Sequence, residues 1–291
     1  MKVKKRWLVF FLLPATLLFV VVFGASLVIL FGSSVTEWTI GKPISFVGLK
    51  NYWYLLTGDR AFRKALMNTV IWILLQSTVH VAIGTTVALI LSRKKFYWKF
   101  VRTVYMIPNI ISSAALGMMF LILFNAQFGF VNKAIQWITN NPDFVKNWFF
   151  EKNTAFFVVS LIWIPYAATI TILIMAEIAA IDEGLLEAAR VDGATELQIN
   201  LRIILPLLRN IIGTCVILGG TSMLQKLDVL MITTGGGPLN ATLNLPMFIY
   251  KTALTENNFG LANTAGVFLI GIGLILVLGV NKLFKLGRSD V

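Results

Sequence analysis

Residues 154–176 read TAFFVVSLIWIPYAATITILIMA, a stretch of 23 residues without one charged side chain. A helix rises about 1.5 Å per residue, so about 20 apolar residues cross the ~30 Å hydrocarbon core of a bilayer. Five further stretches of this kind flank it, and they predict spans at 7–31, 65–92, 103–124, 211–230 and 261–280. The predicted fold class is therefore all-α: a polytopic membrane protein with six transmembrane helices.

The composition agrees with this reading. The chain of 291 residues is 57% apolar and 13% charged, against about 25% charged in an average globular protein. The residues outside the spans are too scattered for a sizeable second domain, so we expect residues 1–291 to form a single transmembrane domain. A soluble enzyme, a nucleic-acid binder and a chain with its own nucleotide-hydrolysing domain are excluded by the same distribution.

The amino-terminal stretch could also be a cleaved secretory signal, because basic residues precede its apolar run. Its 25 uninterrupted residues exceed the 7 to 15 typical of a signal core. We expect an uncleaved first span.

Basic residues are distributed unequally between the two sides of the predicted membrane domain. Fifteen Lys and Arg lie on the side that holds both termini and the loops 93–102 and 177–210, against nine on the other side. Cytoplasmic loops carry the excess of Lys and Arg. The sequence therefore predicts a multi-pass cell-membrane protein with both termini in the cytoplasm.

Few polar side chains interrupt the spans, and each is costly in lipid unless it faces protein or water. Gln76 and His80 lie four residues apart on one helical face, and we favour interhelical hydrogen bonding over a substrate or proton-transfer role. Pro165 interrupts the fourth span between Trp163 and Tyr166. Non-helical backbone at membrane depth is tolerated where it is buried or lines a cavity.

The fifth span carries a polar stripe, because Ser222, Gln225 and Lys226 fall at helical spacing. Hydroxyl, amide and ammonium groups beside aromatic rings suit a ligand rich in hydroxyl groups. An equally weighted alternative is that Lys226 reaches outward and pairs with Asp228. The predicted substrate path consists of Trp163, Tyr166, Thr169, Gly219, Ser222, Met223 and Lys226.

Catalytic and metal-binding patterns are absent from the sequence. One His and one Cys supply neither a metal-ligand set nor a nucleophile with its base. Gly235-Gly236-Gly237-Pro238 lacks the Lys-Ser/Thr ending of a phosphate-binding loop and is read as a turn. We expect no enzyme activity, no metal and no bound cofactor.

The loop 177–210 is the most informative segment outside the spans, since it holds six of the thirteen acidic residues. Asp182 can cap a short helix that Gly193 ends. Thr195 and Gln198 form a capping box for a second helix, which Pro206 breaks. A folded helix, glycine turn and helix on the cytoplasmic side predicts a docking surface for another protein.

The residues of this loop carry a family resemblance. Glu187-Ala188-Ala189, then Gly193, then Ile203-Ile204-Leu205-Pro206 resemble the E-A-A-x-x-x-G-x9-I-x-L-P motif of bacterial ATP-binding-cassette import permeases. Three further pieces are similar to the carbohydrate branch, and within it to the maltose-type first permease subunit: 46–52 (FVGLKNY), Asn68-Thr69 and 234–238 (TGGGP). The chain lacks the extra spans and large outer domain of some maltose permeases.

The resemblance implies a type I importer permease fold in the bacterial plasma membrane, with a coupling helix seated in a cleft of a cytoplasmic ATPase subunit. The implied coupling residues are Glu187, Ala188, Ala189, Asp192, Gly193 and Ala194. The implied partners are a second homologous permease subunit in a heterodimer, two ATP-binding-cassette subunits that hydrolyse ATP with Mg, an extracytoplasmic solute-binding protein, a sugar or oligosaccharide, and membrane lipid.

Two alternatives belong to other classes. An ion-coupled secondary transporter of a polar solute predicts intramembrane carboxylates or paired repeats, and neither is visible. An integral-membrane enzyme requires convergent titratable groups that the spans do not offer. The favoured reading is the permease subunit of an ATP-driven sugar importer.

Overall fold

The computed structural model describes residues 5–93, 96 and 98–287, and their regular secondary structure is almost entirely helical. Two two-residue strands, β1 (Thr36–Glu37) and β2 (Ser45–Phe46), pair antiparallel. The helical elements, in chain order, are α1 (Lys5–Phe19), η1 (Val20–Gly24), α2 (Ala25–Ser34), α3 (Lys50–Thr57), α4 (Arg60–Leu75), η2 (Gln76–His80), α5 (Val81–Leu91), α6 (Trp98–Ile110), α7 (Ser113–Leu123), α8 (Phe130–Thr139), α9 (Ala155–Ile162), η3 (Ile164–Tyr166), α10 (Ala167–Ile178), α11 (Glu183–Val191), α12 (Glu196–Ile199), η4 (Asn200–Ile204), α13 (Leu205–Leu207), α14 (Arg209–Ser222), α15 (Asp228–Thr233), α16 (Leu245–Leu254) and α17 (Phe259–Phe284).

Within the described residues, four helical stretches are long and apolar enough to cross a membrane, or six if each of two bent pairs counts as one. The four are Phe10–Ser34, Arg60–Leu91, Ala155–Ile178 and Phe259–Phe284. The bent pairs are Trp98–Ile110 with Ser113–Leu123, at 101°, and Glu196–Leu207 with Arg209–Ser222, at 70°. These six segments overlap the six stretches expected from the sequence.

The third expected span, 103–124, is not one straight helix. It breaks between α6 and α7. Pro108 lies inside α6, where it removes a backbone donor. Ser112 then adopts an extended conformation, and its side chain accepts a hydrogen bond from Ala115 N at 3.2 Å. A new helix therefore starts at a capped residue in a new direction.

The fifth expected span, 211–230, was also wrong in its extent, because α14 ends at Ser222 and α15 begins only at Asp228. The backbone tightens at this end through bonds of i to i+3 spacing, from Met223 N to Gly220 O and from Leu224 N to Thr221 O. The Ser222 hydroxyl also donates to Gly219 O at 2.7 Å, in competition with the helix pattern. The hydropathy of the sequence gives no information on these local hydrogen bonds, so the predicted span was too long.

The chain divides into two compact units: Met1–Arg63 with Phe248–Gly271, and Lys64–Met247 with Ile272–Val291. In the first unit, the last turn of α2 is tied to α17, since Asn263 Nδ2 donates to Ser33 Oγ at 2.7 Å and Thr264 Oγ1 to Ser34 O at 2.8 Å. The most apolar 18-residue window of Phe10–Ser34 has no buried residue. That surface is suited to contact with lipid or another subunit.

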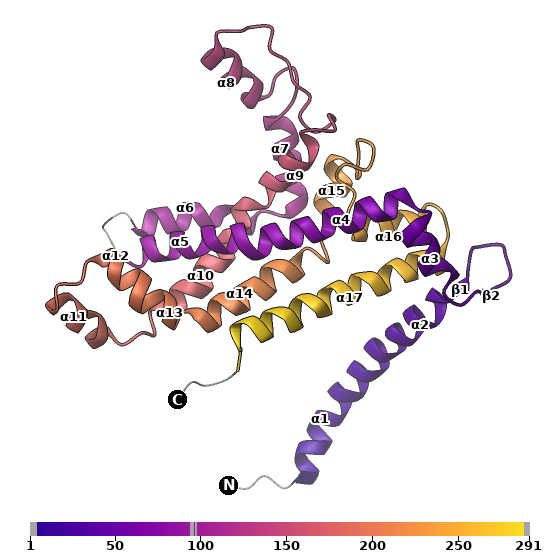
Figure 1. The fold of residues 1–291 in the computed structure, drawn as a ribbon, viewed down its shortest axis with the longest axis horizontal. Coiled ribbons are helices and arrows are strands. Elements are labelled where there is room, and N and C mark those ends of the chain that lie inside the picture. The colour runs from indigo at the N-terminus through magenta and orange to yellow at the C-terminus, as the bar shows by residue number, and fades with distance from the viewer. Residues whose placement is uncertain (1–4, 94–95, 97, 288–291) are drawn as a thin grey trace. The chain divides into compact units, whose positions relative to one another are not determined.

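The second unit has two apolar clusters. The Trp72 cluster joins α4, α9 and α15 through buried residues that include Trp72, Val158, Ile162, Trp163, Met223 and Leu230. The Ile174 cluster joins α5, α10, α12 and α14 through Val81, Ala88, Ile170, Ile174, Ile199, Ile204, Leu208 and Cys215. In Figure 1, α5, α10 and α14 run close to one another.

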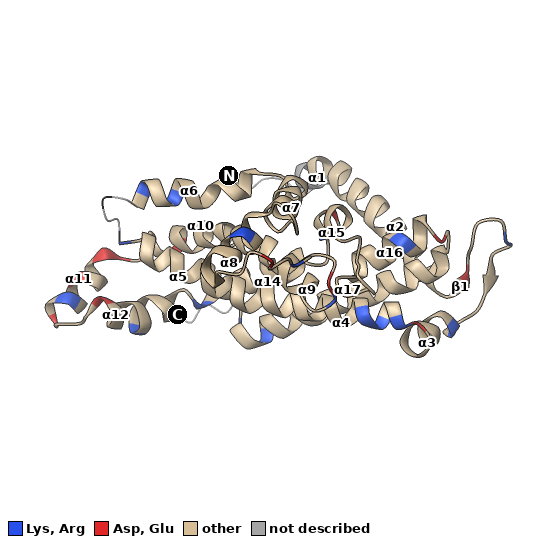
Figure 2. Ribbon diagram, turned by 90° about the horizontal axis from the view of Figure 1, so that it is seen from above, with Lys and Arg blue, Asp and Glu red and all other residues tan. Residues whose placement is uncertain are grey.

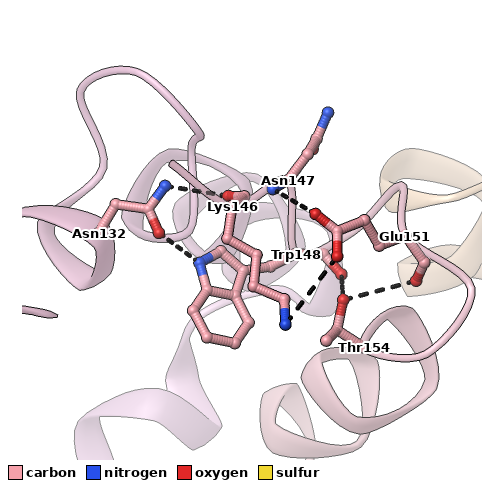
Figure 3. Close-up of polar contacts among 6 residues, drawn as sticks. All are labelled: Asn132, Lys146, Asn147, Trp148, Glu151 and Thr154. Atoms are coloured by element: carbon pink, nitrogen blue, oxygen red, sulfur yellow. Dashed lines mark hydrogen bonds and ion pairs between the residues drawn. The ribbon is translucent and has the colours of Figure 1, made fainter. Parts of the chain in front are cut away.

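A folded loop that contains α8 follows α7, the second helix of the first bent pair. Asn132 holds it, because its Nδ2 donates to Ala126 O and Lys146 O, both at 2.9 Å, while its Oδ1 accepts from Trp148 Nε1 at 2.6 Å. Figure 3 shows Glu151 continuing this network to Asn147 and Lys146. The apolar face of α8 stays open, with Trp137 84% exposed.

Close packing of α5 on α10 generates a stability prediction. A Cβ added at Gly84 would lie 2.6 Å from Ile170 Cβ and 2.9 Å from Ala167 O, and small residues at such crossings let helices approach. We expect Gly84→Val to lower the free energy of unfolding in detergent by about 2 kcal/mol. Gly279→Val is the matched control, because nothing lies within 4 Å of a Cβ there. Equal unfolding midpoints for the two variants would contradict this packing.

Candidate functional site

A cavity of about 210 Å³ in the second unit brings the predicted path residues together. All seven line it: Trp163, Tyr166, Thr169, Gly219, Ser222, Met223 and Lys226. The wall is completed by Gln76, His80, Ile170 and Leu218. Residues from three spans that are distant in sequence therefore share one hollow.

The proline break in the fourth span forms one wall of the cavity. Residues Ile164–Tyr166 make a single tight turn, η3, with Pro165 at its start. Trp163, 1% exposed, packs edge-on against Trp72 with ring centroids 4.8 Å apart. Tyr166 follows on the cavity side. The expected interruption at Pro165 is present, and it turns two aromatic side chains toward the hollow.

The opposite wall requires glycine at positions 219 and 220, where α14 lies close to the segment Gln76–His80. A Cβ at Gly219 would lie 2.8 Å from Gln76 O, and one at Gly220 would lie 2.5 Å from Ser77 Oγ. The partner segment Gln76–His80 is a widened helical turn, η2, of a kind often found at functional sites. Ser77 Oγ also donates to Val216 O at 3.2 Å. Gly219 therefore acts by allowing this close approach.

Lys226 lies past the end of α14, so the polar stripe expected on one helical face is not formed. Gln225 is exposed and lies outside the cavity. Lys226 Nζ sits 4.8 Å from the centroid of the Tyr166 ring, a favourable cation–π distance. Asp228 instead accepts a hydrogen bond from Ser113 Oγ. The alternative of a Lys226–Asp228 ion pair is not realised among the described residues.

Three buried polar side chains of the cavity lack partners. The ring nitrogens of His80, Trp163 Nε1 and the Tyr166 hydroxyl have no hydrogen-bond partner among the described residues. The interhelical hydrogen bond expected of His80 is thus missing, because the neighbouring wall presents the hollow instead of an acceptor. Buried polar groups without partners are uncommon, and each calls for a ligand or water. The sequence favours a structural hydrogen bond for His80 over a role at the cavity. The signal for the cavity role was that no acidic side chain within its own span could pair with the His80 ring.

Thr169 connects the cavity to the bend of the third span. Its Oγ1 donates to Asn109 Oδ1 at 3.2 Å, two residues before the break between α6 and α7. The cavity wall and the bent span are therefore linked by a side-chain hydrogen bond. This contact lay beyond sequence reasoning, which treated Thr169 as part of the path alone.

The loop 177–210 forms the expected helix, glycine turn and helix, here called the elbow (residues 182–199). Asp182 caps α11 by accepting from Gly184 N at 3.0 Å. Gly193 ends it in the left-handed region, at φ +80°. The bonds from Gly193 N to Arg190 O and from Ala194 N to Ala189 O, both 3.0 Å, are those of a Schellman cap.

The second elbow helix begins with the expected capping box. Thr195 N donates to Gln198 Oε1 at 2.7 Å, and Gln198 N to Thr195 Oγ1 at 3.3 Å. An ion pair missed by the sequence reading, Arg190 Nε to Glu196 Oε1 at 3.1 Å, crosses the turn. Both side chains are half-exposed, so the pair orients the turn more than it stabilises it. Charged residues gather on α11 and α12 (Figure 2).

The predicted coupling residues divide between two environments. Glu187, Ala188, Asp192 and Gly193 are exposed, together with Val191 at 88%. Ala189 and Ala194 pack against the Ile174 cluster. Ile170 belongs both to that cluster and to the cavity wall. A continuous apolar contact therefore runs from the inner side of the elbow to the cavity.

Asn68 and Thr69 lie outside both the cavity and the elbow. Asn68 Nδ2 donates to Ala241 O at 3.0 Å and Leu243 O at 2.8 Å, and Leu245 N donates to Thr69 Oγ1 at 2.9 Å. They fix the segment that follows the glycine turn at 235–237. Within the described part of the chain, no group of three metal-binding side chains is found.

Comparisons with known proteins agree with this arrangement. The family described as "Binding-protein-dependent transport system inner membrane component" matches residues 80–285. The probable ABC transporter permease protein YurN of Bacillus subtilis is 30% identical over 263 residues, covering 88% of this chain and 89% of YurN. AmyD of Thermoanaerobacterium thermosulfurigenes, a probable starch degradation products transport system permease protein, is 27% identical, covering 98% and 95% of the two chains.

A solved structure supports the fold. A chain in the crystal structure of a bacterial alginate ABC transporter, in complex with its alginate pentasaccharide-bound periplasmic protein, aligns with a TM-score of 0.82 at 22% identity, over 98% of each chain. The expected all-α importer-permease fold is confirmed. Since the family match covers most of the chain, the protein belongs to the binding-protein-dependent transport system inner membrane components, the permeases of ABC transporters.

Proposed function

We propose that this chain is the membrane-spanning permease subunit of an ATP-driven importer for a sugar or oligosaccharide. The observation that carries the proposal is the continuous apolar contact between the elbow and a cavity lined by both polar and apolar side chains. A packed core transmits displacement because it is nearly incompressible. Movement of the elbow would therefore alter the cavity.

In this proposal the six helical segments form one permease domain, and both termini face the cytoplasm. The excess of Lys and Arg on the side of the elbow supports that orientation. The elbow, with Glu187, Ala188, Ala189, Asp192, Gly193 and Ala194, then docks on a cytoplasmic ATPase subunit. Exposed Glu187 supplies an anionic contact, and exposed Val191 an apolar one.

The partners in the proposed assembly are a second homologous permease subunit, two ATPase subunits and an extracytoplasmic solute-binding protein. ATP with Mg is bound and hydrolysed by the ATPase subunits, and this chain takes no catalytic part. The exposed face of Phe10–Ser34 would be covered by lipid or by the second permease. Closure of the ATPase pair would move the elbows and rock the two permeases between inward-facing and outward-facing states.

The sugar assignment rests on the chemistry of the cavity. Trp163 and Tyr166 offer ring faces, while Ser222, Gln76 and His80 offer donors and acceptors, a combination suited to hydroxylated rings. The relatives named for starch degradation products and for alginate transport support a carbohydrate substrate. Ion-coupled transport has no comparable support, since no acidic residue lines the cavity in the described structure.

Charge and shape at the elbow can be tested directly. Glu187→Lys reverses the exposed charge, and Gly193→Asp places a charged side chain at a left-handed position. We expect ATP-dependent uptake by the assembled transporter to fall at least tenfold in each, with unchanged amounts of the chain in the membrane. Uptake into proteoliposomes and co-elution with the ATPase are the measurements.

Two controls match these changes. Asp143→Lys makes a similar charge reversal on an exposed loop. Gly41→Asp introduces the same side chain at φ +83°, with nothing within 4 Å of its Cβ. Both should transport normally. Normal uptake by Glu187→Lys or Gly193→Asp would refute the coupling role of the elbow.

The cavity is tested separately. Tyr166→Ala removes the ring beneath Lys226, and Ser222→Leu fills the hollow with an apolar side chain. We expect either variant to reduce uptake at least fivefold while the ATPase still co-elutes. Unchanged uptake kinetics in both variants would place the sugar path elsewhere.

A further inference from the structure

The charge of the cavity identifies the class of sugar, provided that the proposed function holds. Lys226 is the single formally charged residue among the eleven that line it in the described structure. The wall of the same cavity includes the apolar residues Ile170, Leu218 and Met223. A cation in such surroundings is costly unless an anion or another compensating group reaches it.

No carboxylate of the described chain forms an ion pair with Lys226, although Asp228 lines a neighbouring hollow together with it. No salt bridge joins it to an acidic group within 4.0 Å, and Asp228 is engaged by Ser113. The backbone at Lys226 is held by Asn244, whose Nδ2 donates to its carbonyl oxygen at 2.6 Å. The ring of Tyr166 lies against the ammonium group at 4.8 Å. The cation is therefore positioned, and its charge is still available.

The unpartnered groups of the cavity include one that can only donate, Trp163 Nε1. The neutral His80 ring and the Tyr166 hydroxyl can each donate and accept. His80 is 9% exposed and Trp163 1% exposed, and these nitrogen atoms have no partner in the described part of the chain. With the Lys226 ammonium group, donors outnumber acceptors. A carboxylate accepts only, whereas a sugar hydroxyl both donates and accepts.

We propose that this cavity receives the carboxylate of a uronic-acid saccharide, with Lys226 as the charge partner and His80 and Trp163 as hydrogen-bond donors. Charge-assisted hydrogen bonds of this kind are about twice as strong as neutral ones. At about 210 Å³, the cavity is small beside an oligosaccharide. It therefore takes one acidic unit of a chain while the remainder extends beyond it.

The test uses the complete transporter in detergent without its solute-binding protein. Tryptophan fluorescence is titrated with α-1,4-digalacturonate and with α-1,4-galactobiose, which differ in their carboxylates. We expect half-saturation with digalacturonate at a concentration at least tenfold lower than with galactobiose. Trp163→Phe should remove most of the signal, because Trp163 lines the cavity.

The variants separate charge from structure. Lys226→Gln should abolish the preference for digalacturonate over galactobiose, whereas Lys226→Arg should retain the preference. Lys133→Gln, a change of the same kind at an exposed position, is the matched control and should behave as the unmodified chain. Equal binding of the two sugars, binding of neither, or an unchanged preference in Lys226→Gln would overturn the proposal.

Failure of this proposal is distinguishable from failure of the proposed function. The same preparation, supplied with its solute-binding protein and ATP in proteoliposomes, reports uptake of both sugars. ATP-dependent uptake of galactobiose without preference for digalacturonate rejects acidic selection and retains the importer. Uptake that persists without ATP rejects the importer and, with it, the charge proposal.

Discussion

The packing of the elbow on the Ile174 cluster is the constraint on which the other features of this protein depend. Ala189 and Ala194 lie against residues of α5, α10 and α14. Those spans also carry His80, Ile170 and Gly219 at the cavity. Because the elbow and one wall of the cavity pack against the same apolar core, a displacement of the elbow is transmitted to the cavity through packed side chains. No separate hinge is required. The small residues of the family motif permit that close seating.

Features encoded by neighbouring residues could be predicted from the sequence. The Asp182 cap, the Gly193 stop and the Thr195–Gln198 capping box depend on bonds between residues two to five apart, and each is present. The apolar stretches located the six helical segments in the same way. All seven residues predicted to form the path line one cavity, because aromatic and polar side chains inside an apolar span have few other environments available.

What could not be predicted depends on tertiary contacts. The end of α14 at Ser222 arises from a hydroxyl bond and tightened backbone turns, whereas hydropathy continues to Leu230. A proline in α6 predicts a break in the helix, but it does not predict that the bend is 101°. The partners of Asn68 lie more than 170 residues away. For His80, the sequence indicated burial, and the space beside the ring was visible only in three dimensions.

The hydrogen bonds that hold the last turn of α2 have a consequence for the order of folding during synthesis. That turn is held early by Asn51 and Tyr52, which bond to Ser34, and late by Asn263 and Thr264 near the carboxyl end. Chains emerge from the ribosome amino end first, at about 5–20 residues per second. The last turn of α2 must therefore wait for the synthesis of α17, more than 220 residues later, before its contacts are complete.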